Sequence, residues 1–294
     1  MPRVVVQAAR ARGSLAVDPK TDEGQWAGAP ERVLAWDEDE TTLAIEAAAA
    51  LPRAPRAVVG PGIDAEALRV ALDLPAPPVT ASDPMAVALG ATGPVLAVGC
   101  PPGTLSAVAA LVDDGEGPGV AAPRDVGHAP RMVSALRALQ ESRRVPPAED
   151  VPDSPMGAYV PWGTWLEDLP ARLRLVAQRC AACGRAAYPP RGACPACRGR
   201  SFEDAPLARE AVVHAATRIG RGGAPSEFAL EQAQVGAYWV AVVEWPAEGV
   251  KVAARLAGYG EEGPAIGDRV RPVVRRLFTQ EGRVRYGVKF APAG

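Results

Sequence analysis

Two Cys-x-x-Cys pairs constrain the fold of this chain more than any other feature. Cys180 and Cys183 form the first pair, Cys194 and Cys197 form the second, and ten residues separate them. Four of the five cysteines therefore lie within eighteen residues. A two-residue spacer lets one tight turn present two thiolates to the same metal ion, so two such pairs supply the four ligands of a tetrahedral site. The pattern predicts a metal-binding ribbon.

Three chemical states fit this cysteine pattern. Structural zinc is the interpretation we favour, because four cysteines complete the shell and leave no open position for a substrate. Iron in a rubredoxin-like site uses the same ligands, and a pair of disulfides is the third alternative. Gly184 and Pro195 suit the sharp turns that the pairs need. The chain start lacks the apolar core of a secretory signal, so we expect reduced thiols, which favour a metal over disulfides.

Composition and charge narrow the function classes. The 294 residues carry 32 basic and 34 acidic side chains, which gives a formal net charge of −2. This balance argues against nucleic acid as a partner, since nucleic-acid-binding domains are usually basic. Residues 85–112 carry no charge, but glycines and prolines between positions 90 and 103 break the run into pieces. A membrane helix needs about 20 unbroken apolar residues. We therefore expect a cytoplasmic protein with no membrane span.

Residues 1–113 show alternating strand and helix patterns. Three strands are expected, at Val4–Ala8, Ala57–Gly60 and Val95–Gly99. Three helices are expected, from Asp37 or Asp39 to Leu51, at Asp64–Leu72 and at Thr104–Val112. Either aspartate can cap the first helix, because a carboxylate accepts hydrogen bonds from the free amides of the first turn. Alternating strands and helices are typical of an α/β layer with parallel strands.

Residues 114–165 have a different composition, because proline and glycine recur through them. One helix is expected near Met132–Ser142, and the remainder is typical of a linker or a docking arm. Trp162 and Trp165 are apolar enough to dock against another surface, which suggests that the first 165 residues do not fold alone. Leu166–Gln178 then has the pattern of an amphipathic helix that leads into the ribbon.

The chain after the ribbon has only strand patterns. Five strands are expected, at Ala211–Thr217, Tyr238–Trp245, Val250–Leu256, Arg269–Leu277 and Arg283–Phe290. Five short strands in about 85 residues favour a small closed barrel, and the OB-fold is the usual five-stranded form. An SH3-like barrel is the alternative.

The ribbon and barrel together resemble a known family. Arg179 to Cys197 reads RCAACGRAAYPPRGACPAC. It is similar to the rubredoxin-like zinc ribbon of the acyl-CoA-associated OB-fold proteins, in which Cys-x-x-Cys-Gly, an aromatic residue before Pro-Pro-Arg, and Cys-Pro-x-Cys follow one another. Ala265–Val270 and Tyr286–Phe290 look like the closing strands of that family. The resemblance covers about residues 166–294.

An early segment resembles a second family. Trp36 to Ala48 reads WDEDETTLAIEAA and is similar to a segment of bacterial and archaeal hydroxymethylglutaryl-CoA synthases, which have the thiolase fold. Ala81-Ser-Asp83 fits the same family more loosely. A complete thiolase-fold enzyme has two α/β halves and about twice this length. The resemblance therefore implies a shortened, degenerate thiolase-like domain.

These resemblances imply an accessory role. The zinc-ribbon family consists mainly of partner subunits or fused domains of thiolases, hydroxymethylglutaryl-CoA synthases, polyketide-type acyltransferases and sterol side-chain aldolases. A member is expected to dock on a thiolase- or ketosynthase-fold catalytic subunit and to help form its acyl-CoA channel. Acyl-CoA or another acyl thioester is the implied substrate, and a CoA thioester shared with that partner is an implied cofactor.

Cys100 is the one candidate nucleophile. Thiolase-type chemistry needs a cysteine at a helix N-terminus, activated by histidine. Cys100 follows a strand, but Pro101-Pro102 stands where the family has a turn rich in alanine and glycine. The two histidines, His128 and His214, lie in the linker and in a barrel strand. We interpret Cys100 as a buried structural thiol and keep a small acyltransferase that uses it as an alternative.

Two glycine-containing loops are candidate anion sites. Gly60-Pro-Gly62 lies between a strand and a helix, but Asp64 would compete with a phosphate for the helix amides, so a plain turn is favoured. Arg218 precedes the loop Gly220–Gly223, Arg221 lies within it, and both are candidate contacts to CoA phosphates. Four aromatic residues are a candidate binding face of the barrel, although core or partner packing is favoured: Tyr238, Trp239, Phe278 and Tyr286.

The sequence predicts an α+β multidomain protein. Its expected parts are a truncated thiolase-like α/β domain (1–113), a linker or docking arm (114–165), a helix with the zinc ribbon (166–206) and an OB-fold barrel (207–294). The predicted function is a non-catalytic accessory subunit of a thiolase-superfamily complex that makes or breaks carbon–carbon bonds. A zinc-ribbon/OB module that binds nucleic acid is the alternative from another class.

Overall fold

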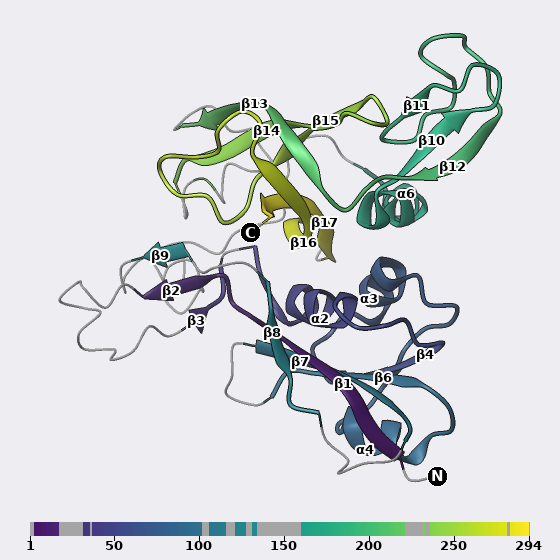
Figure 1. Ribbon diagram of the computed structural model, residues 1–294, viewed down its shortest axis with the longest axis vertical. Helices are drawn as coiled ribbons and strands as arrows, with labels where there is room; N and C mark the ends of the chain where they lie inside the picture. Colours follow the sequence, from purple (N-terminus) through teal and green to yellow (C-terminus); the bar gives the residue numbers. More distant parts are fainter. Residues whose placement is uncertain are drawn as a thin grey trace. The chain divides into compact units, whose positions relative to one another are not determined.

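Two units make up the chain, Met1–Ala148 (unit 1) and Glu149–Gly294 (unit 2), and each has its own sheets (Figure 1). The computed structural model describes residues 3–17, 32–35, 37–101, 106–115, 121–127, 131–133, 160–220, 232, 236–280 and 283–293. Among these residues, none of the helices has both the length and the apolar character that a membrane crossing requires.

A six-stranded sheet forms the centre of unit 1, in the order β5-β4-β6-β7-β1-β8. Its strands are β1 (Arg3–Arg12), β4 (Arg56–Val59), β5 (Val79–Thr80), β6 (Val95–Gly99), β7 (Ser106–Asp114) and β8 (Arg124–Val126). β7 runs antiparallel to β6 and β1, whereas the other pairs are parallel. The expectation of parallel pairing is thus wrong for β7, and the sheet is mixed. A smaller sheet joins β2 (Leu15–Val17), β3 (Arg32–Val33) and β9 (Arg131–Val133).

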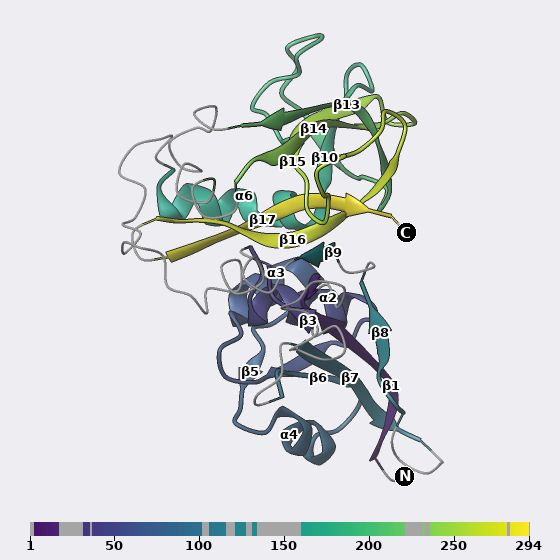
Figure 2. The same cartoon turned by 90° about the vertical axis from the view of Figure 1, so that its left-hand side faces the viewer.

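Helices cover both faces of the six-stranded sheet. α2 (Glu40–Ala49) and α3 (Ala65–Leu72) lie on one face and α4 (Pro84–Gly90) on the other (Figure 1, Figure 2). Of the two expected capping residues, Asp39 caps α2. Its carboxylate accepts the Thr42 amide at 2.9 Å, and the Thr42 hydroxyl accepts the Asp39 amide at 2.9 Å. This reciprocal capping fixes the start of α2 through neighbouring residues alone.

The helix expected at Thr104–Val112 is wrong, because Ser106–Asp114 forms strand β7. The run of apolar residues in this segment is short and unbroken, a pattern that fits a buried helix and a buried strand equally well. β7 lies between β6 and β1, and Ala109 to Val112 are all buried. Of the helix expected at Met132–Ser142, the first two residues belong to strand β9, and residues 134–142 lie outside the described residues.

The ribbon of unit 2 follows helix α6 (Trp162–Arg174). Its sheet has the order β11-β10-β12, formed by β10 (Val176–Cys180), β11 (Ala186–Ala187) and β12 (Phe202–Pro206). The amphipathic character of α6 is confirmed, because Trp165, Leu169 and Leu173 are buried at a spacing of four residues. The helix begins and ends earlier than expected, since β10 takes up Val176 onward.

Five antiparallel strands follow the ribbon, in the order β15-β14-β13-β16-β17 (Figure 1). They are β13 (Ala211–Ile219), β14 (Tyr238–Trp245), β15 (Val250–Arg255), β16 (Arg269–Gln280) and β17 (Arg283–Pro292). All five strand predictions are confirmed, with ends that differ by a few residues. The two outer strands of this order, β15 and β17, meet at one isolated parallel bridge between Leu256 and Phe290.

The ribbon and the five-stranded sheet share one hydrophobic core. Leu175, Ala177 and Leu207 from the ribbon pack in the same buried cluster as the strand residues Trp245 and Phe290. The rings of Trp245 and Phe290 meet edge to face, with their centroids 5.6 Å apart. The Trp245 Nε1 donates to the carbonyl oxygen of Ala208 at 2.9 Å. Because buried apolar surface is the main favourable term in folding, the two parts stabilise each other.

The tryptophan pair expected in a linker lies in α6 and packs on strands β16 and β17. Trp165 meets Phe278 edge to face at 5.8 Å. The Arg285 guanidinium lies 4.5 Å from the Trp162 ring and 5.5 Å from the Trp165 ring. The expected docking surface for these indoles is therefore part of the same unit, which sequence spacing does not show.

Candidate metal centre

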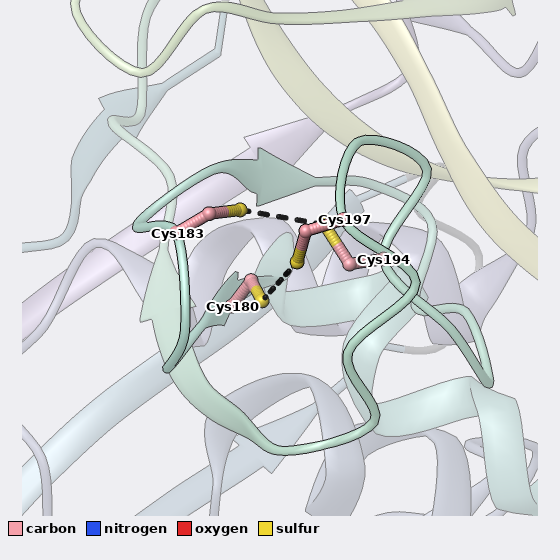
Figure 3. A group of neighbouring side chains, drawn as sticks. All are labelled: Cys180, Cys183, Cys194 and Cys197. Atoms are coloured by element: carbon pink, nitrogen blue, oxygen red, sulfur yellow. Dashed lines mark hydrogen bonds between the residues drawn. The ribbon is translucent and has the colours of Figure 1, made fainter.

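The four paired cysteines converge at one end of the ribbon (Figure 3). Cys180 is the last residue of β10, and Cys183 follows in the turn after it. Cys194 and Cys197 lie in the loop between β11 and β12. Cys180 and Cys194 are buried, whereas Cys183 and Cys197 are exposed. Each pair thus contributes one inner and one outer thiol.

Distances between the sulfur atoms fit a tetrahedral metal site. All four Sγ atoms lie within 4.8 Å of one another. Cys180 and Cys197 are 3.5 Å apart at Sγ, and Cys183 and Cys194 are 3.6 Å apart. Tetrahedral zinc with bonds of about 2.3 Å needs sulfur–sulfur distances of about 3.8 Å. A disulfide needs about 2.05 Å, so this arrangement favours a metal over the disulfide alternative.

Backbone hydrogen bonds shape the two cysteine turns. The Gly184 amide donates to the Cys180 carbonyl oxygen at 2.8 Å, and the Arg198 amide donates to the Cys194 carbonyl oxygen at 2.9 Å. Gly184 has φ +72°, a conformation that glycine adopts readily. The sequence reasoning missed Gly199, where a Cβ would lie 3.4 Å from the sulfur atoms of both Cys180 and Cys197. Gly199 lies two residues after Cys197, and this position next to the second cysteine pair is a signal that could have identified it.

The thiols influence one another's ionisation. The amides of Cys197 and Ala196 are the main cause that lowers the pKa of Cys194 to about 6. At Cys197 the Gly199 amide also lowers the pKa, but the neighbouring Cys183 and Cys180 outweigh it and raise the value to about 12. Four close thiolates repel one another, so a divalent cation is the group that lets all of them ionise together. The donor set therefore fits a soft or borderline divalent metal.

The environment of Cys100 does not favour the thiolate that a nucleophile needs. Burial, with the Glu40 and Asp39 carboxylates, raises its pKa to about 12. Its Sγ lies 3.9 Å from the carbonyl oxygen of Glu40. The segment after Cys100 leads into strand β7, so the helix N-terminus expected there to favour a thiolate does not form. The described part of unit 1 includes no histidine, because His128 lies outside it.

His214 belongs to an exposed charged cluster on the five-stranded sheet. Its Nδ1 lies 2.8 Å from a Glu244 carboxylate oxygen, and the Lys251 Nζ lies 3.4 Å from the other oxygen. Glu244 and Lys251 are direct partners between β14 and β15. The sequence prediction did not include this cluster. Pairing the predicted strands Tyr238–Trp245 and Val250–Leu256 as a hairpin would have placed Glu244 opposite Lys251. Such an exposed group is typical of a solvated sheet face.

The loop at Gly60 is a plain turn, as predicted. The Asp64 carboxylate accepts the amides of Glu66 and Ala67 at 3.0 and 2.9 Å and so caps α3. These are the amides that a phosphate at this helix would use. Of the two candidate CoA contacts, Arg218 pairs with Glu261 at 2.5 Å, and Arg221 lies outside the described residues.

The four aromatic residues expected to form a binding face of the barrel lie on the five-stranded sheet and are mostly occupied by packing, as favoured from the sequence. Tyr238 and Tyr286 are buried. Trp239 donates from Nε1 to the Gly260 carbonyl oxygen at 2.9 Å. Its ring also covers Gly263, where a Cβ would lie 2.3 Å from the indole, so only glycine fits. The fourth, Phe278, packs on α6.

Comparisons with known proteins agree with the ribbon. The family described as "ChsH2, rubredoxin-like zinc ribbon domain" matches residues 168–203. A relative from Methanothermobacter thermautotrophicus, named "DUF35 domain-containing scaffold protein", is 30% identical over 132 residues, which is 44% of this chain and 93% of that protein. A relative of the same name from Methanocaldococcus jannaschii is 30% identical over 124 residues, which is 41% of this chain and 83% of that protein.

One solved structure is also similar. The chain titled "Ltp2-ChsH2(DUF35) aldolase" is 27% identical, and the match covers 47% of this chain and 100% of that chain with a TM-score of 0.35. Each match leaves more than half of this chain uncovered.

Proposed function

The chain belongs to the DUF35 zinc-ribbon family, and from this membership we propose that it is a non-catalytic scaffold subunit. The supporting observation is 30% identity over 93% of the length of a protein that is named a scaffold. We propose that it docks in the cytoplasm on a thiolase-fold catalytic subunit and helps to shape the channel for acyl-CoA or another acyl thioester. The partner would supply the chemistry that makes or breaks a carbon–carbon bond.

Zinc is the metal that we propose for the ribbon. Cys180, Cys183, Cys194 and Cys197 would hold it, and four thiolates leave no position for a substrate or a water nucleophile. When bound, the metal cross-links the two cysteine turns and so contributes to folding stability. The ribbon shares its core with the five-stranded sheet, so we expect the metal to stabilise both parts.

An OB-type barrel is our proposal for residues 207–294. The antiparallel order β15-β14-β13-β16-β17 supports it, and so does the parallel bridge from Leu256 to Phe290, which joins the two outer strands. These features are those of a partly open five-stranded Greek-key barrel. For unit 1 we propose a truncated thiolase-like origin, on the basis of the sequence resemblance at Trp36–Ala48. A mixed sheet with helices on both faces is compatible with it.

The absence of catalysis in this chain is likewise a proposal, supported by the environment of Cys100. A thiol with a pKa near 12 carries almost no thiolate at neutral pH. Contact between CoA phosphates and Arg218 or Arg221 also remains a prediction. For Arg218 to bind a phosphate, its ion pair with Glu261 would have to open.

Affinity purification tests the scaffold role directly. The tagged full chain is expressed in its own host, and every protein that co-purifies is identified by mass spectrometry. We expect a thiolase-fold subunit in stoichiometric amount. Recovery of the chain alone, or with nucleic acid, would contradict the proposal.

Two matched cysteine-to-serine variants sharpen this experiment. Cys183→Ser removes a ribbon ligand, so we expect loss of metal and of the partner. Cys100→Ser changes the same atom in the other unit, so we expect it to retain the partner and the acyl-CoA turnover of the purified complex. The role would be wrong if the chain alone turned over acyl-CoA and Cys100→Ser abolished that activity.

A further inference from the structure

A hollow of about 430 Å³ lies in unit 2 between the ribbon and the turn that leads into β15. Its wall is formed by residues 185–188, 191 and 195 of the ribbon and by residues 249–251 of the turn and β15. Figure 1 shows this turn beside β11. Two wall residues, Ala186 and Val250, belong to the core that the ribbon and the five-stranded sheet share. Because that core holds both sides together, the floor of the hollow is fixed.

The charged residues of the wall are all cations. Arg185 and Arg191 are exposed, and in the part of the chain that the structure describes neither guanidinium has an ion pair or a hydrogen bond. The third cation, Lys251, is already engaged, because its Nζ lies 3.4 Å from a Glu244 carboxylate oxygen and 3.0 Å from the His214 Nε2. No carboxylate lines the hollow. The two arginines therefore carry positive charge that no residue of the wall neutralises.

The rest of the ribbon adds to this charge. Residues 176–202 contain five arginines and no lysine, aspartate or glutamate. Four thiolates around one divalent metal ion carry a formal charge of about −2, so the loaded ribbon keeps a net charge of about +3. The chain as a whole has a formal net charge of −2. The ribbon therefore attracts anionic groups although the whole chain is slightly acidic.

The wall favours carboxylates that a protein surface presents. A guanidinium binds a carboxylate through two parallel hydrogen bonds, and arginine is enriched at protein interfaces. Single-stranded nucleic acid fits less well, because its bases stack on aromatic rings. Tyr188 is the one aromatic residue of the wall, and its ring packs against Trp245 while its hydroxyl donates to the Arg172 carbonyl oxygen at 3.4 Å. This ring is thus occupied within unit 2.

We propose that the hollow is a docking site for an acidic segment of the catalytic partner subunit, whose carboxylates pair with Arg185 and Arg191. The identity of the partner as a thiolase-fold subunit rests on the proposed function, whereas the place and the charge of the docking site rest on the ribbon. Ion pairs at the rim of an interface mainly set orientation and association rate. Association should therefore become slower as salt is added.

Charge reversal of both arginines tests the site in the purified complex. In Arg185→Glu/Arg191→Glu, like charges face the acidic segment, so we expect the dissociation constant for the partner to rise about tenfold or more at about 0.1 M salt. The matched control is Arg200→Glu/Arg209→Glu, which makes the same change of charge at two exposed arginines outside the wall. It should weaken binding about threefold or less. Equal effects of the two double variants would overturn the assignment.

A cross-linking measurement on the wild-type complex needs no change to the arginines. A carbodiimide joins lysine amines to carboxylates without a spacer, and this chain has three lysines, Lys20, Lys251 and Lys289. Lys251 is exposed and lines the hollow, whereas Lys289 is buried. We expect a link from Lys251 to an aspartate or glutamate of the partner. Glu244→Gln removes the competing carboxylate within the chain and should increase this link, and a Glu244→Gln complex without it would contradict the site.

A synthetic probe separates this site from the scaffold role. Binding of fluorescein-labelled hexaglutamate to the full, zinc-loaded chain is followed by anisotropy at about 10 mM ionic strength, where the Debye length is about 30 Å. Binding that Arg185→Glu/Arg191→Glu abolishes supports the hollow even if no thiolase-fold subunit co-purifies. A partner that binds this variant as tightly as the wild type refutes the hollow and leaves the scaffold role intact. Displacement of the peptide by oligothymidylate or inorganic phosphate at lower concentration than by unlabelled hexaglutamate assigns the arginines to another ligand and overturns the proposal.

Discussion

Replacement of Trp245 by phenylalanine tests whether the ribbon and the five-stranded sheet share one core. Trp245 exposes 1% of its surface and packs between Tyr188 of the ribbon, at a centroid distance of 6.4 Å, and Phe290 of β17. The substitution removes about three buried heavy atoms, which contribute about 2 kcal/mol. It also removes the hydrogen bond to Ala208, a net loss of about 1 kcal/mol. We therefore expect the free energy of unfolding of unit 2 to fall by about 3 kcal/mol.

Trp239 provides a matched control on the same strand. Trp239→Phe removes the same atoms and a hydrogen bond of the same length, 2.9 Å, to Gly260. Its side chain is only partly buried, and the lost bond is exposed to water. Water replaces part of what is lost, so we expect a decrease of about 1 kcal/mol. The comparison separates burial from the chemistry of the side chain.

Hydrogen exchange with mass spectrometry is the suitable assay, because it reports on unit 2 peptides separately from unit 1. A loss of 3 kcal/mol in the opening free energy should speed exchange of the β14 amides by about 100-fold in Trp245→Phe. Ribbon peptides from β10 and β12 should speed up to a similar extent, since they share the core. Equal effects of the two substitutions, or faster exchange in β14 without any change in the ribbon, would refute the reasoning.

Three further predictions concern the metal, the free thiol and a helix cap. Elemental analysis should find about one zinc per chain and none in Cys194→Ser, whereas the visible absorbance of an iron–thiolate centre would contradict zinc. Burial and two carboxylates raise the pKa of Cys100 to about 12, so its alkylation rate should rise about tenfold for each pH unit from 8 to 10; a plateau near pH 9 would contradict this environment. Asp64→Ala removes the α3 cap and should lower the free energy of unfolding of unit 1 by about 1 kcal/mol in urea denaturation; an unchanged midpoint would contradict a stabilising cap.

The features that the sequence by itself determined depend on interactions between residues that are close together in the chain. The cysteine spacing predicts the ribbon, because each turn needs only the residues within it to place two sulfur atoms together. The caps at Asp39 and Asp64 are local in the same way, since a carboxylate bonds amides two or three residues ahead. Runs of strand-forming residues between glycine, proline and charged turns predict all five strands after the ribbon, because each run can be recognised within one segment. Membership of the zinc-ribbon family followed from the same local pattern.

Packing between distant segments decided the rest. Ser106–Asp114 became a strand because β1, about a hundred residues earlier, pairs with it, and its own apolar run fits a helix equally well. The sequence predicts a docking arm for Trp162 and Trp165, because no residue near them in the chain identifies their partners on β16 and β17. The bridge between Leu256 and Phe290 joins the ends of two strands, β15 and β17, that are not consecutive in the chain. Short-range patterns carry no information about contacts between distant segments, so only the tertiary structure showed which strands and side chains pack together.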